Sequence, residues 1–128
     1  MKYLKKYNES LDENELKEFC EGCLAYLTDD LNLTVEPAYK QEGVYEINLY
    51  HETKRFSWQK IKDYYIPFIQ LLANRYELVA LTGNPLLGFV VKIADDFSGY
   101  YHYTYEEIIN DSVGVTQFNS ISVYVTDK

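Results

Sequence analysis

Two histidines in this chain are each followed, two positions later, by a threonine, and this pattern could support acid–base chemistry. The two segments are His51-Glu52-Thr53 and His102-Tyr103-Thr104. Residues two apart on a β-strand point to the same face, so each segment would place an imidazole beside a hydroxyl. If both pairs met at one phosphate group, one imidazole could accept a proton while the other donated one, with the hydroxyls as anchors.

The double pattern resembles the 2H phosphoesterases, which carry two His-x-Thr/Ser motifs on strands of a bilobal fold. Members cleave cyclic phosphates or phosphodiesters without a metal, and phage-encoded members destroy host signalling nucleotides. The resemblance implies a phosphodiesterase with His51 and His102 as the acid–base pair and with Thr53 and Thr104 holding the phosphate. Lys54 departs from the apolar residues that the family places around this threonine.

The strand that leads to His51 argues for a different arrangement. Its alternation places His51 on the same face as three residues that a helix would cover, namely Tyr45, Ile47 and Leu49. His102 shares its face with Tyr100 and Thr104, which do not determine which side is buried. We therefore expect the two imidazoles not to share a pocket, and we expect no catalytic residues.

Two cysteines three residues apart, Cys20 and Cys23, could form a redox pair or half of a metal site. Redox cysteines lie at the start of a helix, where the helix dipole lowers the pKa of the thiol. These two instead belong to the apolar stripe of a helix, and a structural zinc site would need two more ligands close by. We expect reduced, largely buried thiols, and neither a metal nor a cofactor.

Composition limits the possible partners. The 128 residues carry a net charge of −8, and residues 93–127 contain six acidic residues and no Lys or Arg. Phosphate backbones repel such a surface, which argues against general nucleic-acid binding. No apolar run approaches the roughly 20 residues of a membrane span, and the two cysteines are typical of a reducing environment. We expect a cytoplasmic protein without membrane attachment.

A basic cluster around the only tryptophan is a candidate interaction surface, formed by Lys54, Arg55, Trp58 and Lys62. An exposed tryptophan surrounded by positive charge is typical of a contact anchor. The alternative is that Trp58 is buried and stabilises the start of a helix together with Phe56.

The predicted fold class is α+β, with a mainly antiparallel sheet, two main helices packed on one face, and the order α-β-β-α-β-β-β. We treat residues 1–128 as one domain with a short basic arm at residues 1–9. The first helix follows a cap at Ser10, with Asp12 as the rival position, and ends at Asp29-Asp30. A hairpin comes next, with strands around residues 31–36 and 45–49. A second helix begins after Ser57, and Pro67 should kink or restart it.

The second half of the chain is predicted to be richer in strands. Three are expected at residues 76–81, 89–94 and 100–103, and a short helix capped by Thr104 runs through Asn110. A last strand alternates around Ile121, Val123 and Val125.

The opening segment, MKYLKKYNES, and the stretch at residues 56–68 resemble small accessory proteins of tailed bacteriophages. Leu11-Asp12-Glu13 also matches the short Leu-x-Glu pattern after which some phage packaging peptides are cut, although helix capping explains it equally well. The resemblance implies a non-enzymatic interaction module that binds and modulates a host or defence protein. Small size, acidity and 14 tyrosines are consistent with this hypothesis.

Overall fold

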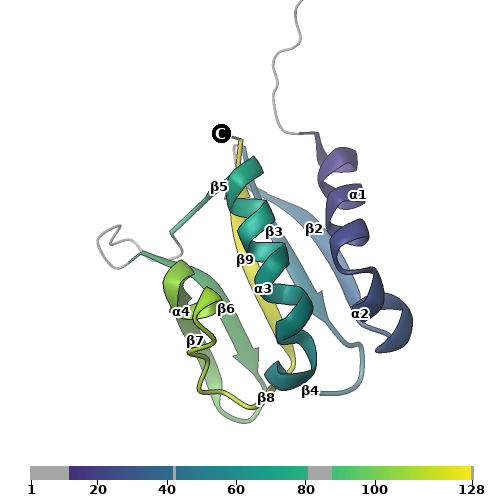
Figure 1. Ribbon diagram of the computed structural model, residues 1–128, viewed down its shortest axis with the longest axis vertical. Helices are drawn as coiled ribbons and strands as arrows, with labels where there is room; N and C mark the ends of the chain where they lie inside the picture. The colour runs from purple at the N-terminus through teal and green to yellow at the C-terminus, as the bar shows by residue number, and fades with distance from the viewer. Residues whose placement is uncertain (1–11, 42, 81–87, 128) are drawn as a thin grey trace, which may run out of the picture.

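The computed structural model describes residues 12–41, 43–80 and 88–127, and these form an α+β fold of two layers (Figure 1). One layer is an antiparallel sheet, and the other consists of helices that lie on one face of it, which confirms the predicted class. In chain order the elements are α1 (Glu13–Cys23), α2 (Ala25–Asp30), β2 (Thr34–Gln41), β3 (Val44–Tyr50), β4 (Phe56–Ser57), α3 (Trp58–Arg75), β5 (Glu77–Leu78), β6 (Phe89–Asp95), β7 (Gly99–Thr104), α4 (Tyr105–Ile109), β8 (Gln117–Phe118) and β9 (Ser120–Thr126).

The last strand of the chain lies at the centre of the sheet. Within the described residues the main sheet has six strands in the order β2-β3-β9-β6-β7, with β5 also paired to β9. Ile121, Val123 and Val125 of β9 are fully buried, because strands flank β9 on both sides and α3 lies over it. The core is therefore complete only when the C-terminal strand is in place. In the strand order given above, β2 and β7 are the two edge strands of the sheet.

Alternation along the strands separates the two faces of the sheet. Ile47, Val123 and Val91 lie side by side on the face that the helices cover. The neighbouring row, with Asn48, Ser122 and Lys92, must point to the opposite face. No described helix packs on that second face, which we call the helix-free face.

The first helix is capped two residues later than the favoured prediction. Asp12 is the N-cap residue of α1, and its carboxylate accepts hydrogen bonds from the backbone N–H groups of Asn14 and Glu15. The rival position was therefore correct, and Ser10 lies outside the described residues, as does the arm at residues 1–9. Leu24 interrupts the predicted helix, so α2 is a separate short element that ends at Asp30 as expected.

The second main helix begins as predicted. The hydroxyl of Ser57 accepts a hydrogen bond from the backbone N–H of Lys60, and Phe56 and Ile61 are both buried. The helix continues through Pro67 as one element and does not restart. Pro67 is exposed, and water can satisfy the carbonyl group that loses its partner there.

The strand-rich half differs from the prediction in two places. Thr104 and Glu107 form the expected reciprocal cap of α4. The strand predicted at residues 76–81 is reduced to β5, which pairs with the end of β9; residue 81 lies outside the described residues. A small second sheet, formed by β4 and β8, was not predicted, because two-residue strands have no periodicity to detect.

Candidate functional site

The two histidines occupy different kinds of position. His51 follows β3 in the connection to β4, and its Nδ1 accepts hydrogen bonds from the backbone N–H groups of Thr53 (3.1 Å) and Lys54 (3.0 Å). The chain therefore turns at His51 instead of continuing as a strand. His102 lies within β7 on the helix-free face, where its ring is 6.1 Å from that of Phe89.

The sheet register keeps the two imidazoles apart. His102 pairs with Lys92, Lys92 with Ser122, and Ser122 with Asn48, which precedes His51 by three residues. Three strand spacings of about 4.8 Å separate the ends of this row by about 14 Å. His51 and His102 also line different hollows that have no residue in common. They do not share a pocket, as we expected.

The threonines of the two motifs do not complete a phosphate site either. Thr53 is exposed in the turn after His51. The hydroxyl of Thr104 accepts the backbone N–H of Glu107 as the cap of α4. The structure therefore does not bring His51, Thr53, His102 and Thr104 together.

Burial makes the cysteines poor nucleophiles. Cys20 and Cys23 are free thiols, with Cys20 fully buried and Cys23 half-buried. Burial, with a smaller contribution from Cys23, raises the pKa of the Cys20 thiol to about 12. Burial also raises the pKa of the Cys23 thiol. Within the described ranges no group of three His, Cys, Asp or Glu side chains could hold a metal ion.

The predicted basic surface needs a correction, because Trp58 is only 5% exposed. Its indole Nε1–H donates to Asp111 Oδ1 at 2.6 Å, and Lys62 Nζ lies 2.7 Å from Asp111 Oδ2. The carboxylate of Asp111 thus holds both side chains against the segment after α4. Hydrogen bonds from Lys62 and Trp58 lower the pKa of Asp111. Trp58 is a core residue and cannot act as an exposed anchor.

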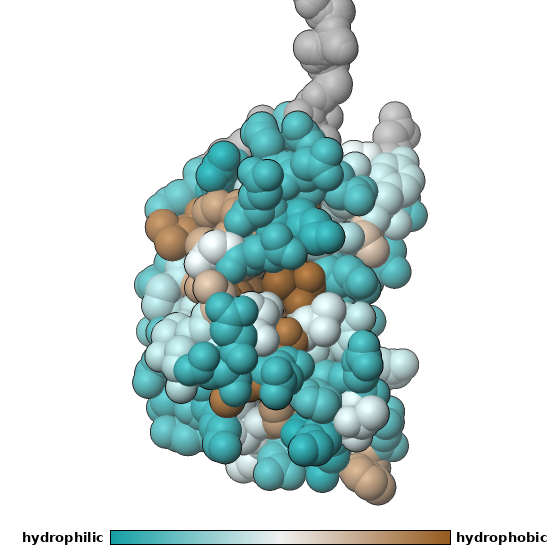
Figure 2. All heavy atoms as spheres, turned by 90° about the vertical axis from the view of Figure 1, so that its right-hand side faces the viewer, coloured by the Kyte–Doolittle hydropathy of each residue, from teal (hydrophilic) through white to brown (hydrophobic). Residues whose placement is uncertain are grey.

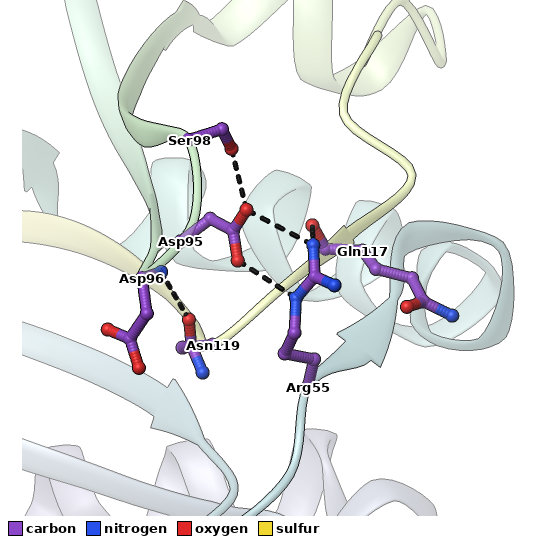
Figure 3. Close-up of polar contacts among 6 residues, drawn as sticks. All are labelled: Arg55, Asp95, Asp96, Ser98, Gln117 and Asn119. Carbon is purple, nitrogen blue, oxygen red and sulfur yellow. Dashed lines mark hydrogen bonds and ion pairs between the residues drawn. The ribbon is translucent and has the colours of Figure 1, made fainter.

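Arg55, another member of the predicted surface, connects separate parts of the fold (Figure 3). Its Nε and Nη2 donate to the carboxylate of Asp95 at 2.9 and 3.1 Å, and Nη2 also reaches the carbonyl oxygen of Gln117. The hydroxyl of Ser98 donates to the same carboxylate at 2.6 Å. Hydrogen bonds from Ser98 and Arg55 lower the pKa of Asp95, whose side chain is 1% exposed. This ion pair has a structural role, because it ties the β3–β4 connection to β6 and β8.

The two edges of the sheet differ in the features that prevent edge-to-edge pairing. Proteins protect exposed edges with proline, charged residues and irregular register. β2 has all three: Pro37, which is buried, the exposed charges of Glu36 and Lys40, and a register shift after Tyr39. The side of the molecule that carries α1 and β2 is accordingly mostly hydrophilic, with small hydrophobic patches (Figure 2).

β7, the opposite edge, lacks the proline and the charges, and the register shift in its pairing with β6 lies on the β6 side, between Phe89 and Val91. Its sequence, GYYHYT, contains no proline and no charged residue. Among the described residues its backbone is paired with β6 only. Tyr100 is 71% exposed, and Lys92 Nζ lies 5.4 Å from the centre of its ring. We call residues 99–104 the β7 edge.

Acidic residues flank the β7 edge at both ends. Asp96 lies in the turn before β7, and Glu106 lies in the first turn of α4; both are exposed. Figure 3 shows the Asp96 carboxylate pointing away from the Arg55–Asp95 pair. Neither side chain has an ion-pair partner among the described residues. This edge was not predicted from the sequence, although the nine residues between Asp96 and Glu106 are all uncharged.

Comparison with known proteins gives no relative from which a function could be transferred. No protein-family model, curated protein or solved structure matches this chain. None of the described helices combines the length and the hydrophobicity that crossing a membrane requires.

Proposed function

We propose that this chain is a non-enzymatic interaction module that binds a protein partner through the β7 edge. Unpaired backbone N–H and C=O groups on an exposed edge can accept an additional strand, which is a common way of recognising an extended segment. The observation that carries the proposal is the contrast between the edges: β2 is protected by proline and charge, and β7 is not. Tyr100 adds an exposed aromatic surface beside the backbone.

The charge around this edge defines the chemistry of the partner. A strand added beside β7 would lie between Asp96 and Glu106, so basic residues near its ends would meet unpaired carboxylates. A second copy of the chain is a poorer occupant. Antiparallel pairing of two β7 edges about a two-fold axis would bring Asp96 of one copy towards Glu106 of the other.

The biological setting follows from the sequence and is part of the proposal. An acidic module that captures an extended basic segment is suited to bind and modulate a host or defence protein. This is the role implied by the resemblance to accessory proteins of tailed bacteriophages, acting in the host cytoplasm.

A display selection with random ten-residue peptides tests the proposal. We expect the selected peptides to carry Lys or Arg towards both ends, and we would measure their affinities by fluorescence anisotropy. The variant Asp96→Lys/Glu106→Lys should lose this binding. The matched control, Glu21→Lys/Asp29→Lys, changes the net charge equally on exposed positions of α1 and α2 and should bind nearly as well as the wild type. Equal losses in both variants would contradict the proposal.

A further inference from the structure

A second surface feature is a hollow lined by basic residues, in contrast to the acidic residues that flank the β7 edge. A hollow of about 240 Å³ lies where the α2–β2 connection, the β3–β4 connection, the start of α3 and β8 meet. No acidic residue is among those lining it, although the chain carries a net charge of −8. The lining residues are Leu31, Asn32, Leu33, His51, Lys54, Arg55, Phe56, Ser57, Lys60 and Gln117.

Two lysines line this hollow, and among the described residues neither has a carboxylate as an ion-pair partner. Ion pairs within the described residues involve Lys40, Arg55 and Lys62, and neither Lys54 nor Lys60 takes part in one. Two uncompensated ammonium groups at one hollow repel each other, and a bound anion would relieve that repulsion. The hollow therefore has the electrostatic character of an anion site.

The backbone fixes how His51 can contribute. Its Nδ1 accepts two backbone N–H groups, so in the neutral imidazole the proton must be on Nε2. Nε2 is therefore a hydrogen-bond donor in the tautomer that this geometry requires. Two ammonium groups and this N–H make three donors around one space, without an acidic acceptor among the lining residues.

Other groups near the hollow also favour a bound anion. Arg55 retains Nη1 as a donor, although Asp95 already compensates its charge. The hollow lies beside Ser57, the cap of the 18-residue α3, so the positive end of the helix dipole is nearby. Asp30 and Glu52 are next in sequence to lining residues but do not line the hollow themselves.

We propose that this hollow binds the phosphate group of a small phosphorylated molecule, with Lys54, Lys60 and His51 Nε2 as its donors. A phosphate monoester carries close to two negative charges near neutral pH and offers several strong acceptor oxygens, which matches two ammonium groups and an N–H. A carboxylate offers one charge and two oxygens, so it would leave part of this donor set unused. The site is independent of the β7 edge, because none of its lining residues belongs to β7.

Titration with two phosphate sources and a carboxylate tests this inference. Inorganic phosphate and ribose 5-phosphate would be added at constant ionic strength, with acetate as the comparison, while ¹H–¹⁵N spectra follow His51, Lys54 and Lys60. We expect saturable shifts at these residues with phosphate or ribose 5-phosphate, and the tighter of the two identifies the free ion or the ester as the better ligand. Acetate should bind at least tenfold more weakly. Shifts that grow linearly without saturation, or acetate binding as tight as phosphate, would overturn the proposal.

Charge-matched variants separate a specific site from general attraction. Lys54→Gln and Lys60→Gln should each weaken phosphate binding by about tenfold, because each removes one charged donor. Lys17→Gln, on the exposed side of α1, changes the net charge equally and should leave the affinity within twofold. Unchanged thermal unfolding would show that the variants fold. An equal loss in all three variants would contradict a site at the start of α3.

Discussion

Tyr65 provides a sharp test of the core packing, because its hydroxyl is buried and has no hydrogen-bond partner among the described residues. The side chain is 1% exposed, and its oxygen makes no hydrogen bond in the part of the chain that the structure describes. The ring packs edge-on to Trp58, with 6.1 Å between ring centres, and lies 5.6 Å from that of Phe68. Burial also raises the pKa of this hydroxyl. Tyr65→Phe would remove the oxygen and keep the ring.

The expected effect follows from the cost of an unsatisfied polar group. Leaving a buried hydroxyl unpaired costs about 1–3 kcal/mol, and Phe avoids this cost while leaving a space of only one oxygen atom. Allowing for that small cavity, Tyr65→Phe should raise the free energy of unfolding by about 1–2 kcal/mol. In a chain of this size the melting temperature would rise by about 3–8 °C.

Urea and thermal unfolding, followed by circular dichroism, measure this effect, and Tyr103→Phe is the matched control. Burial raises the pKa of Tyr103, and the backbone groups of Gly114 and Val115 act in the opposite direction, as groups that interact favourably with its hydroxyl. Its removal should lower the free energy of unfolding by about 1 kcal/mol. If Tyr65→Phe were destabilising like the control, the hydroxyl would have a partner in solution, such as a buried water, and the reasoning would be refuted.

Three further predictions concern the same fold. Trp58→Ala should destabilise the protein by about 3–5 kcal/mol in urea unfolding, because the indole is buried; a loss below 1 kcal/mol would place Trp58 at the surface. The fold lowers the pKa of Asp95 below its ordinary value near 4, so the ionised carboxylate stabilises the folded state at pH values above about 4. This stability is lost as the pH falls through the lowered pKa. Melting temperatures between pH 6 and pH 2 should thus fall less steeply in Asp95→Asn than in the wild type, and parallel curves would exclude this contribution. A thiol reagent such as DTNB should modify Cys23 well before Cys20 in the native protein, unlike in urea, because only Cys23 is partly exposed.

Local patterns predicted much of the fold. The reciprocal cap formed by Thr104 and Glu107, and the cap at Ser57, were readable because their partners lie three residues apart. Alternation around Ile121 and Val123 likewise indicated a strand with a buried face. The choice of Ser10 over Asp12 failed, because two overlapping capping patterns differ too little in sequence to be ranked.

Long-range pairing explains what the sequence could not predict. Nothing local to β9 indicates that it lies between β3 and β6, so the identity of β7 as an edge was hidden. Trp58 was compatible with both a core and a surface position, and Asp111, 53 residues later, decides between them. His51 continued the alternation of β3 in sequence, but its ring bonds to the backbone of the following turn. For each of these residues, the contact that determines its position is made with a residue distant in sequence or with a backbone group.

Hydrogen exchange of the β7 amides tests the proposed function most directly. A peptide selected for binding should slow exchange at residues 99–104 at least tenfold, because an added strand pairs with the outward-facing backbone groups of β7. The amides of the opposite edge, β2, should exchange as they do in the free protein. Protection that appears on β2 or on the helices, with β7 unchanged, would contradict binding through the β7 edge.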